Sequence, residues 1–111
     1  MFGAPLIKKQ QVRHTLAELK TDCMIARIIN DNATSAYANK VLDNETISMT
    51  KYWTSEKEVD FLTQCQQLFG GYGFMEEYPI ATAWTQARVD PIHGGTSEIM
   101  KEIISRRIVY A

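Results

Sequence analysis

Apolar positions repeat with a helical period along most of the chain. From Lys8 to Val41 they advance in steps of four and three residues, the spacing of one buried face of an α-helix. At 1.5 Å per residue this helix would be about 45–50 Å long, which indicates packing against more than its own neighbours in the chain. The stripe consists of Val12, Leu16, Leu19, Cys23 and Ala26, widened by Met24, Ile25, Ile28 and Ile29.

A second helix is predicted from about residue 45 to 69. The stretch 42–46 interrupts the first pattern, and Asp43 or Asn44 can cap the next helix, with Glu45 near its positive end. Glu56 falls on or near the apolar face, where we expect it to lie at the rim. That face carries Met49, Tyr52, Trp53, Val59, Leu62, Cys65 and Phe69.

Two shorter helices follow. Gly70 in the left-handed conformation is the simplest end for the second helix, and Pro79 fits the first turn of a third helix that ends near Val89. After a turn at 90–91, Thr96 or Ser97 can cap a fourth helix. No segment alternates cleanly enough to predict a strand. The pattern therefore predicts one all-α domain over residues 1–111, an up-down four-helix bundle.

Composition narrows the class of protein. The 111 residues carry a net charge of −1 and are 45% hydrophobic, so we expect a sizeable core and no nucleic-acid partner. No apolar run approaches 18 residues, so no membrane span is expected, and the charges of the first residues follow the apolar part, unlike a signal peptide. We expect Cys23 and Cys65 to be buried free thiols in a reducing compartment.

Five of the six glycines fall in two turns, Gly70–Gly73 and Gly94–Gly95. The first turn follows a helix, not a strand, which excludes the dinucleotide fingerprint and leaves a helix end or a ligand contact. The second turn opens a helix, where free N–H groups suit an anion or a carbonyl oxygen, and ordinary capping by Thr96 is the alternative. No metal is expected, because His14 and Glu18 lack the Glu-x-x-His pattern of bundle metal sites.

Two longer motifs surround these glycines. Residues 67–74 read Gln-Leu-Phe-Gly-Gly-Tyr-Gly-Phe and are followed by Glu77-Tyr78-Pro79, and residues 92–99 read Ile-His-Gly-Gly-Thr-Ser-Glu-Ile. With Arg106 beyond them and Phe2, Gly3 and Gln10 before them, the chain resembles the C-terminal helical domain of the acyl-CoA dehydrogenase family. Residues 51–53 and 100–102 make it most similar to the long-chain type.

The resemblance implies an oxidoreductase of fatty acid β-oxidation, which removes hydrogen from the α and β carbons of an acyl-CoA thioester and passes a hydride to FAD. It implies an electron-transfer flavoprotein as electron acceptor, a dimer or tetramer as assembly, and bacterial cytoplasm or mitochondrial matrix as compartment. It further implies that Arg106 lies near the CoA moiety and Gly94 near the thioester. The residues it assigns to FAD are Phe2, Gln10, Gln67, Gly70, Gly71, Thr96 and Glu98.

The chain departs from the family at the position of the catalytic base. Many members carry a glutamate where this chain has Gly94, whereas long-chain-type members place the base on a preceding helix, which would lie before Met1. No catalytic side chain is therefore expected here, although the Gly94 N–H can still polarise the thioester carbonyl. A second departure is Gln86, where the family usually has aspartate.

The N-terminal helical domain and the middle β domain of complete family members have no counterpart in these 111 residues. We therefore expect the chain to be inactive alone and to build part of a FAD site and a subunit interface. The alternative is a stand-alone helical bundle that acts in protein–protein interaction, with apolar helix faces that drive association.

Overall fold

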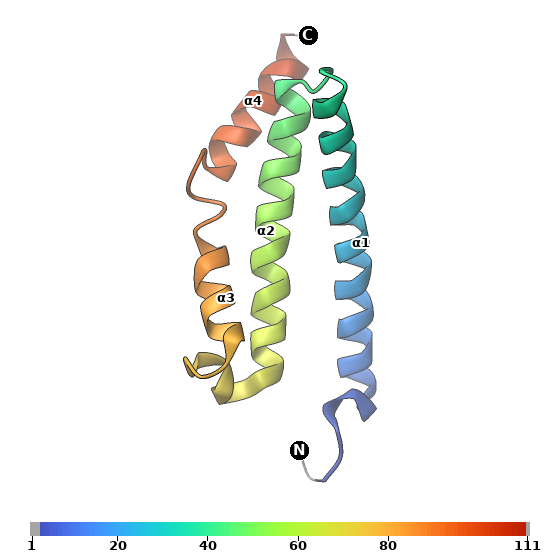
Figure 1. Ribbon diagram of the computed structural model, residues 1–111, viewed down its shortest axis with the longest axis vertical. Helices are drawn as coiled ribbons and strands as arrows, with labels where there is room; N and C mark the ends of the chain where they lie inside the picture. The colour runs from blue at the N-terminus through green and yellow to red at the C-terminus, as the bar shows by residue number, and fades with distance from the viewer. Residues whose placement is uncertain (1–2, 111) are drawn as a thin grey trace.

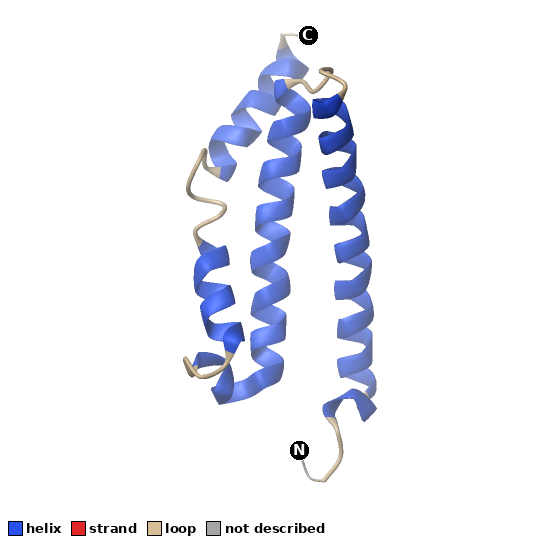
Figure 2. Cartoon of the chain, in the orientation of Figure 1, coloured by secondary structure: helices blue, strands red, loops and turns tan. Residues whose placement is uncertain are grey.

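The computed structural model of the chain describes residues 3–110, and within them it contains helices and connections but no strand (Figure 1, Figure 2). The four predicted helices are present, which confirms the all-α, four-helix prediction. The α-helices are α1 (Gln10–Ala38), α2 (Asn44–Phe69), α3 (Pro79–Arg88) and α4 (Ser97–Val109), and short 3₁₀ turns η1 (Leu6–Lys8) and η2 (Gly70–Phe74) precede α1 and follow α2.

Capping explains where three of the helices begin. The Asp43 carboxylate accepts a hydrogen bond from the Thr46 N–H at 2.7 Å, and this bond holds the pKa of Asp43 below its ordinary value. The Thr96 hydroxyl accepts from the Ile99 N–H at 3.2 Å and starts α4 in the same way. Pro79 occupies the first turn of α3, as predicted.

The first helix ends three residues earlier than predicted, at Ala38 instead of Val41. Lys40 adopts a positive φ of 59°. The Val41 N–H bonds back to the Ala36 carbonyl at 2.9 Å, and the Lys40 N–H bonds to that of Tyr37 at 3.1 Å. These two bonds form a Schellman motif, which satisfies the last carbonyls and turns the chain away. The apolar Val41 extends the helical pattern in the sequence but lies beyond this stop.

The helix α2 lies in the middle of the molecule (Figure 1). The helix α1 runs antiparallel to it on one flank, while α3 and α4 follow one another back along the other flank. Among the described residues α2 approaches each of the other helices closely, whereas α1 approaches neither α3 nor α4. The result is an elongated body of 58 × 27 × 25 Å in which three rows of helix lie side by side.

This arrangement buries little apolar surface, contrary to the expected sizeable core. Within residues 3–110 the buried apolar side chains are Leu19, Ala33 and Ala87. The reason is geometric, because α1 packs on one helix only and keeps most of its circumference in solvent. Its side chains Met24, Ile25 and Ile28 are exposed, although they belong to the predicted apolar stripe.

The exposure of the two cysteines has the same geometric cause. Both cysteines are free, but Cys23 is exposed and Cys65 is half-buried, so the prediction of two buried thiols is wrong. Partial burial raises the pKa of the Cys65 thiol, with a smaller contribution from the nearby Cys23. No helix in the described part of the chain is long and apolar enough to cross a membrane.

Polar contacts tie the outer helices to α2. Lys57 of α2 pairs with Asp22 of α1 at 3.7 Å, and on the other flank the Trp84 indole N–H donates to the Thr63 hydroxyl at 2.7 Å. Lys101 of α4 lies 3.8 Å from the Glu56 carboxylate. Glu56 is exposed, which confirms the rim position predicted for it. The contact between α1 and α2 therefore depends on few residues, and Leu19 is the largest apolar side chain among the fully buried ones.

Replacing Leu19 with alanine tests this dependence. The side chain is 2% exposed, so Leu19→Ala should lower the free energy of unfolding by about 2–4 kcal/mol through lost burial and a residual cavity. Met24→Ala is the matched control on the same helix, because Met24 is 67% exposed and its loss should change stability by less than about 0.5 kcal/mol. Urea unfolding followed by circular dichroism measures both, and equal effects would contradict the assignment of Leu19 as the centre of the α1–α2 contact.

Candidate functional site

The turn that opens α4 is the part of the chain best shaped for a ligand. Gly94 and Gly95 have φ angles of +65° and +105°, which side chains rarely tolerate. The Gly94 N–H, the Gly95 N–H and the Glu98 N–H have no hydrogen-bond partner within residues 3–110. These donors lie at the positive end of a 13-residue helix, where an anion or a carbonyl oxygen is stabilised. Capping by Thr96 is confirmed, and ligand contact stays a prediction.

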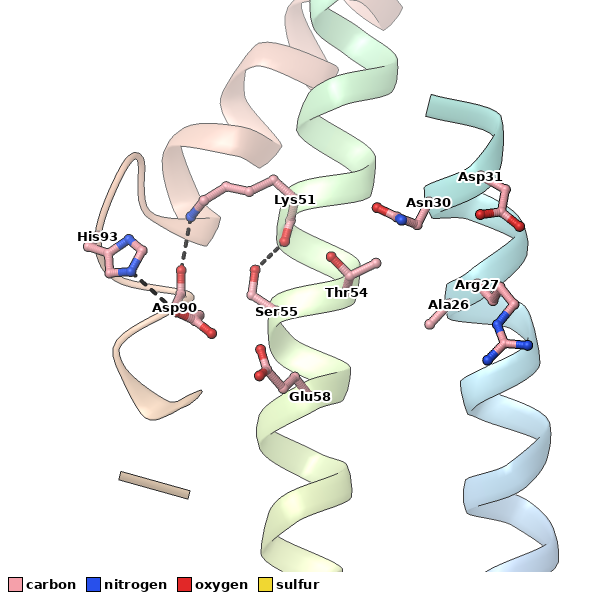
Figure 3. Close-up of a pocket in the computed structure, with 10 residues that line it drawn as sticks. All are labelled: Ala26, Arg27, Asn30, Asp31, Lys51, Thr54, Ser55, Glu58, Asp90 and His93. Carbon is pink, nitrogen blue, oxygen red and sulfur yellow. Dashed lines mark hydrogen bonds and ion pairs between the residues drawn. The ribbon is translucent and has the colours of Figure 1, made fainter. Parts of the chain in front are cut away.

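A lysine from the central helix holds this turn. The Lys51 ammonium donates to the Asp90 carbonyl at 3.1 Å and, through a short hydrogen bond, to the Gly95 carbonyl. Figure 3 shows the lysine reaching from α2 to Asp90 in the connection between α3 and α4. The two acceptors stand at the ends of residues 90–95, so one side chain spans the loop that contains Gly94.

Beside this loop lies a cavity of about 660 Å³, here called the central cavity (Figure 3). It is open to solvent and lined mainly by polar and charged residues, and it lies between α1, α2 and the loop before α4. Its lining residues are Ala26, Arg27, Asn30 and Asp31 from α1, Lys51, Thr54, Ser55 and Glu58 from α2, and Asp90 and His93 from the loop.

Two carboxyl groups meet in the central cavity. Partial desolvation, with a hydrogen bond to Asp90 and repulsion from its charge, raises the pKa of Glu58 to about 6. Asp90 also lies 3.2 Å from His93, measured between Oδ1 and Nε2. With its raised pKa, Glu58 can share a proton with the neighbouring carboxyl of Asp90. Glu58 and Asp90 were not among the site residues predicted from the sequence.

The other glycine turn, η2, is built differently. Gly70 has φ 61° and ψ −141°, so it ends α2 as predicted, but with an extended ψ in place of the left-handed helical conformation. A Cβ on Gly73 would lie 2.7 Å from both the carbonyl oxygen and the Cγ of Gln66, whereas one on Gly71 would meet nothing within 4 Å. Gly73 is thus required by close approach to α2, and the space around Gly71 is open to a ligand.

The structure sorts the predicted site residues into three levels along the molecule (Figure 1). One end carries Gln10, at the start of α1, and Gln67, Gly70 and Gly71, at the end of α2. Gly94, Thr96 and Glu98 lie together midway along the molecule. Arg106 lies ten residues further along α4, about 15 Å from Thr96, where its guanidinium pairs with Glu102 at 3.1 Å. Phe2 lies outside the described residues.

The spacing of apolar residues does not identify Lys51 and Glu58 as site residues. They belong to a polar stripe on the central helix, Ser48, Lys51, Ser55 and Glu58, which advances in steps of three, four and three. That spacing puts all four on one face of α2. Ser48 and Ser55 are buried, Lys51 is half-buried and Glu58 is exposed, so the stripe runs from the interior to the solvent. The signal available in the sequence was a set of polar residues spaced three and four apart on α2, the helix that packs against all the others.

The described residues place no group of three His, Cys, Asp or Glu side chains where it could hold a metal ion. The donors at the start of α4 suit the phosphates of a nucleotide cofactor or a polarised carbonyl, since they are backbone N–H groups at a helix N-terminus. The backbone N–H groups at Thr96 and Glu98 therefore suit an anionic group of FAD, such as a phosphate.

Comparison with known proteins identifies relatives of this arrangement. A family model described as acyl-CoA dehydrogenase, C-terminal domain, matches residues 1–109. The mitochondrial long-chain specific acyl-CoA dehydrogenase of Rattus norvegicus is 50% identical over 108 residues, which are 97% of this chain and 25% of that protein. The chain thus spans about a quarter of the length of this curated relative.

Solved structures give the same result for the fold. The acyl-CoA dehydrogenase of Geobacillus kaustophilus superposes with a TM-score of 0.94 at 34% identity, over 97% of this chain and 28% of that one. A chain from a structure of the electron transferring flavoprotein of Acidaminococcus fermentans superposes with a TM-score of 0.94 at 26% identity, over 100% of this chain and 29% of that one.

The two unequal glycines of η2 give a matched pair of substitutions. Gly73→Ala should lower the free energy of unfolding by about 1–3 kcal/mol, because its Cβ would overlap the backbone of α2. Gly71→Ala meets open space and should change stability by less than about 1 kcal/mol, with a stabilising contribution from the unfolded chain. Denaturant unfolding of both variants is the measurement, and a neutral Gly73→Ala would refute the close approach.

The raised pKa of Glu58 predicts a pH dependence of stability. Its folded-state pKa of about 6 lies above the ordinary value of 4.5 for a glutamate, so Glu58 favours folding at low pH and this contribution is lost as the pH rises through 4.5–6. Glu58→Gln should therefore gain stability over the parent at pH 7.5 and not at pH 4. The gain should be at most about 1 kcal/mol, because the side chain is exposed and solvent screens its interactions.

Thermal unfolding of parent and variant at the two pH values measures this difference. The exposed Glu77 has no hydrogen bond or ion pair within residues 3–110, so Glu77→Gln serves as the control with no pH-dependent gain. A Glu58→Gln advantage that is equal at pH 4 and pH 7.5 would contradict the assigned titration.

Proposed function

Because this chain belongs to the acyl-CoA dehydrogenase family, we propose that it is the C-terminal domain of a FAD-dependent enzyme that dehydrogenates fatty acyl-CoA thioesters between their α and β carbons. The observation that carries the proposal is the turn at Gly94, where N–H groups without a partner among residues 3–110 lie at the start of α4 and a Cβ on Gly94 would meet nothing within 4 Å. The match of the chain to the long-chain relative supports a fatty acyl substrate.

FAD would contact two regions of the chain. Thr96 and Glu98 would bind it at the start of α4, where the helix dipole favours its phosphates. Gln67, Gly70 and Gly71 would contact the adenosine diphosphate part of the FAD of a neighbouring subunit, and the open space at Gly71 supports this. Gln10, with Phe2, would contribute at the same end. When bound, FAD supplies the acceptor for the hydride that leaves the β carbon.

The contribution of this chain to the chemistry would be electrostatic. As the α proton leaves, negative charge develops on the thioester oxygen, and a preorganised backbone donor such as the Gly94 N–H stabilises it. Gly94 has no side chain to remove that proton, so the base would come from a preceding helix outside these residues. The exposed Arg106 would lie near the CoA moiety, whose phosphates its guanidinium can bind.

A domain of this kind would not act alone. The exposed apolar side chains of α1, among them Met24, Ile25 and Ile28, support burial against other domains or subunits of a dimer or tetramer. The electrons would pass to an electron-transfer flavoprotein. The compartment would be bacterial cytoplasm or mitochondrial matrix, as the sources of the relatives suggest.

The same exposed apolar side chains favour a second function, that of a stand-alone helical bundle in protein–protein interaction. The two functions differ in their need for FAD. An interaction module would associate without a flavin, whereas a dehydrogenase domain completes a flavin site when joined to the remaining domains.

A chimera separates these functions. This chain would replace the corresponding 108 residues of the rat long-chain enzyme, to which it is 50% identical. We expect the purified chimera to retain FAD absorbance and to lose that absorbance on addition of a long-chain acyl-CoA, while the isolated chain mixed with FAD reduces no electron acceptor. A folded chimera without flavin would overturn the proposed domain function, and acceptor reduction by the isolated chain would overturn its dependence on other domains.

A further inference from the structure

We infer that Lys51 is a positioning residue that holds the Gly94 turn, and so directs the Gly94 N–H toward the carbonyl that it would polarise. The inference rests on the proposed function for the role of that N–H, but the tether itself rests on hydrogen bonds of this chain. Lys51 lies on α2, 39 residues before Asp90 and 44 before Gly95, and its ammonium donates to the carbonyl oxygens of both.

The Ser97 N–H closes the loop around the two glycines by donating to the Pro91 carbonyl at 3.1 Å, but the glycines themselves make few direct contacts. Glycine gives up more conformational freedom on ordering than any other residue, and two left-handed glycines follow one another here. Gly94 is exposed, and the N–H groups of Gly94, Gly95 and Thr96 have no hydrogen-bond partner within residues 3–110. Within residues 3–110, the bond from Lys51 to the Gly95 carbonyl is the one hydrogen bond that joins either of the two glycines directly to α2.

The lysine acts through geometry and charge together. Its three donors allow it to serve two carbonyls at once, and because these carbonyls flank Gly94 their positions fix the path of the backbone between them. Lys51 has no carboxylate within ion-pair distance among the described residues. Its positive charge therefore adds to the positive N-terminal end of α4, which also favours charge that develops next to Gly94.

The helices do not depend on this tether. Thr96 caps α4 through its own side chain, and Lys101 joins α4 to α2 through Glu56 and the face of the Tyr52 ring. Removing the Lys51 ammonium should therefore loosen the turn while the helices persist. A lysine with a merely structural role would instead change global stability and leave no local signature at the glycines.

Backbone ¹⁵N relaxation of this chain tests the tether directly. In Lys51→Met we expect the order parameters of Gly94 and Gly95 to fall below about 0.6, while those of Ile103 and Ile104 within α4 stay near 0.85. Lys51→Arg keeps the charge and several donors and should restore most of the order. Lys57→Met is the matched control, because Lys57 is a half-buried lysine of the same helix that pairs with Asp22 instead. Unchanged order at both glycines in folded Lys51→Met would overturn the inference.

The parent chain offers a second measurement if Lys51→Met does not fold. Hydrogen-bonded ammonium protons of Lys51 should exchange slowly with water and show nuclear Overhauser contacts to residues 90 and 95. Rapid exchange without those contacts, at a temperature where the backbone resonances of α2 and α4 show a folded chain, would overturn the tether.

The catalytic consequence is measured in the FAD-loaded chimera. We expect Lys51→Met to lower kcat by roughly 10- to 100-fold, the effect of a misplaced oxyanion donor, with KM for acyl-CoA within about twofold of the parent. Lys57→Met should leave both unchanged. Parent-like kcat in a flavin-loaded Lys51→Met chimera would overturn the positioning role. A chimera that binds no flavin would refute the proposed function alone, because the relaxation experiment judges the tether independently.

Discussion

Every helix of this chain depends on α2 for its packing. The helix α1 contacts α2 on one flank, α3 and α4 contact it on the other, and within residues 3–110 α1 reaches neither of those two. One helix must therefore carry an apolar face for each neighbour and also the seam between them. Lys51, Ser55 and Glu58 line the central cavity in that seam, and Lys51 reaches the loop before α4 from there.

The helices were predictable because their ends are encoded locally. Asp43 and Thr96 cap the helices that follow them, and Pro79 begins the third helix, each through contacts within a few residues. The Schellman motif at Lys40 is equally local but has no glycine to mark it, so α1 was predicted too long. Burial was not predictable in this way, since the period of an apolar stripe identifies a face but not whether another element covers it. The exposed Cys23 thiol is a direct consequence.

The candidate site, too, was predictable where its features are local and not where they depend on tertiary packing. The two glycine turns could be found in the sequence, because glycine clusters indicate positive φ or close approach, and Gly73 and Gly94 each meet one of these needs. The groups that surround them could not be found. The bond from Lys51 to Gly95 joins residues 44 apart, and the pairing of Glu58 with Asp90 requires α2 and the loop before α4 to be adjacent. Such contacts follow from tertiary packing and not from spacing.

A backbone donor differs from a side-chain base in what must support it. A glutamate can be aimed by its own rotamer, whereas the direction of the Gly94 N–H is the direction of the backbone at a residue with φ +65° and open space around it. Gly94 has no side chain to fix the direction of its N–H. That direction therefore has to be set by the neighbouring residues and by α2, to which Gly95 is hydrogen-bonded. Under the proposed function, α2 would meet this requirement through Lys51, whose side chain reaches both ends of the loop.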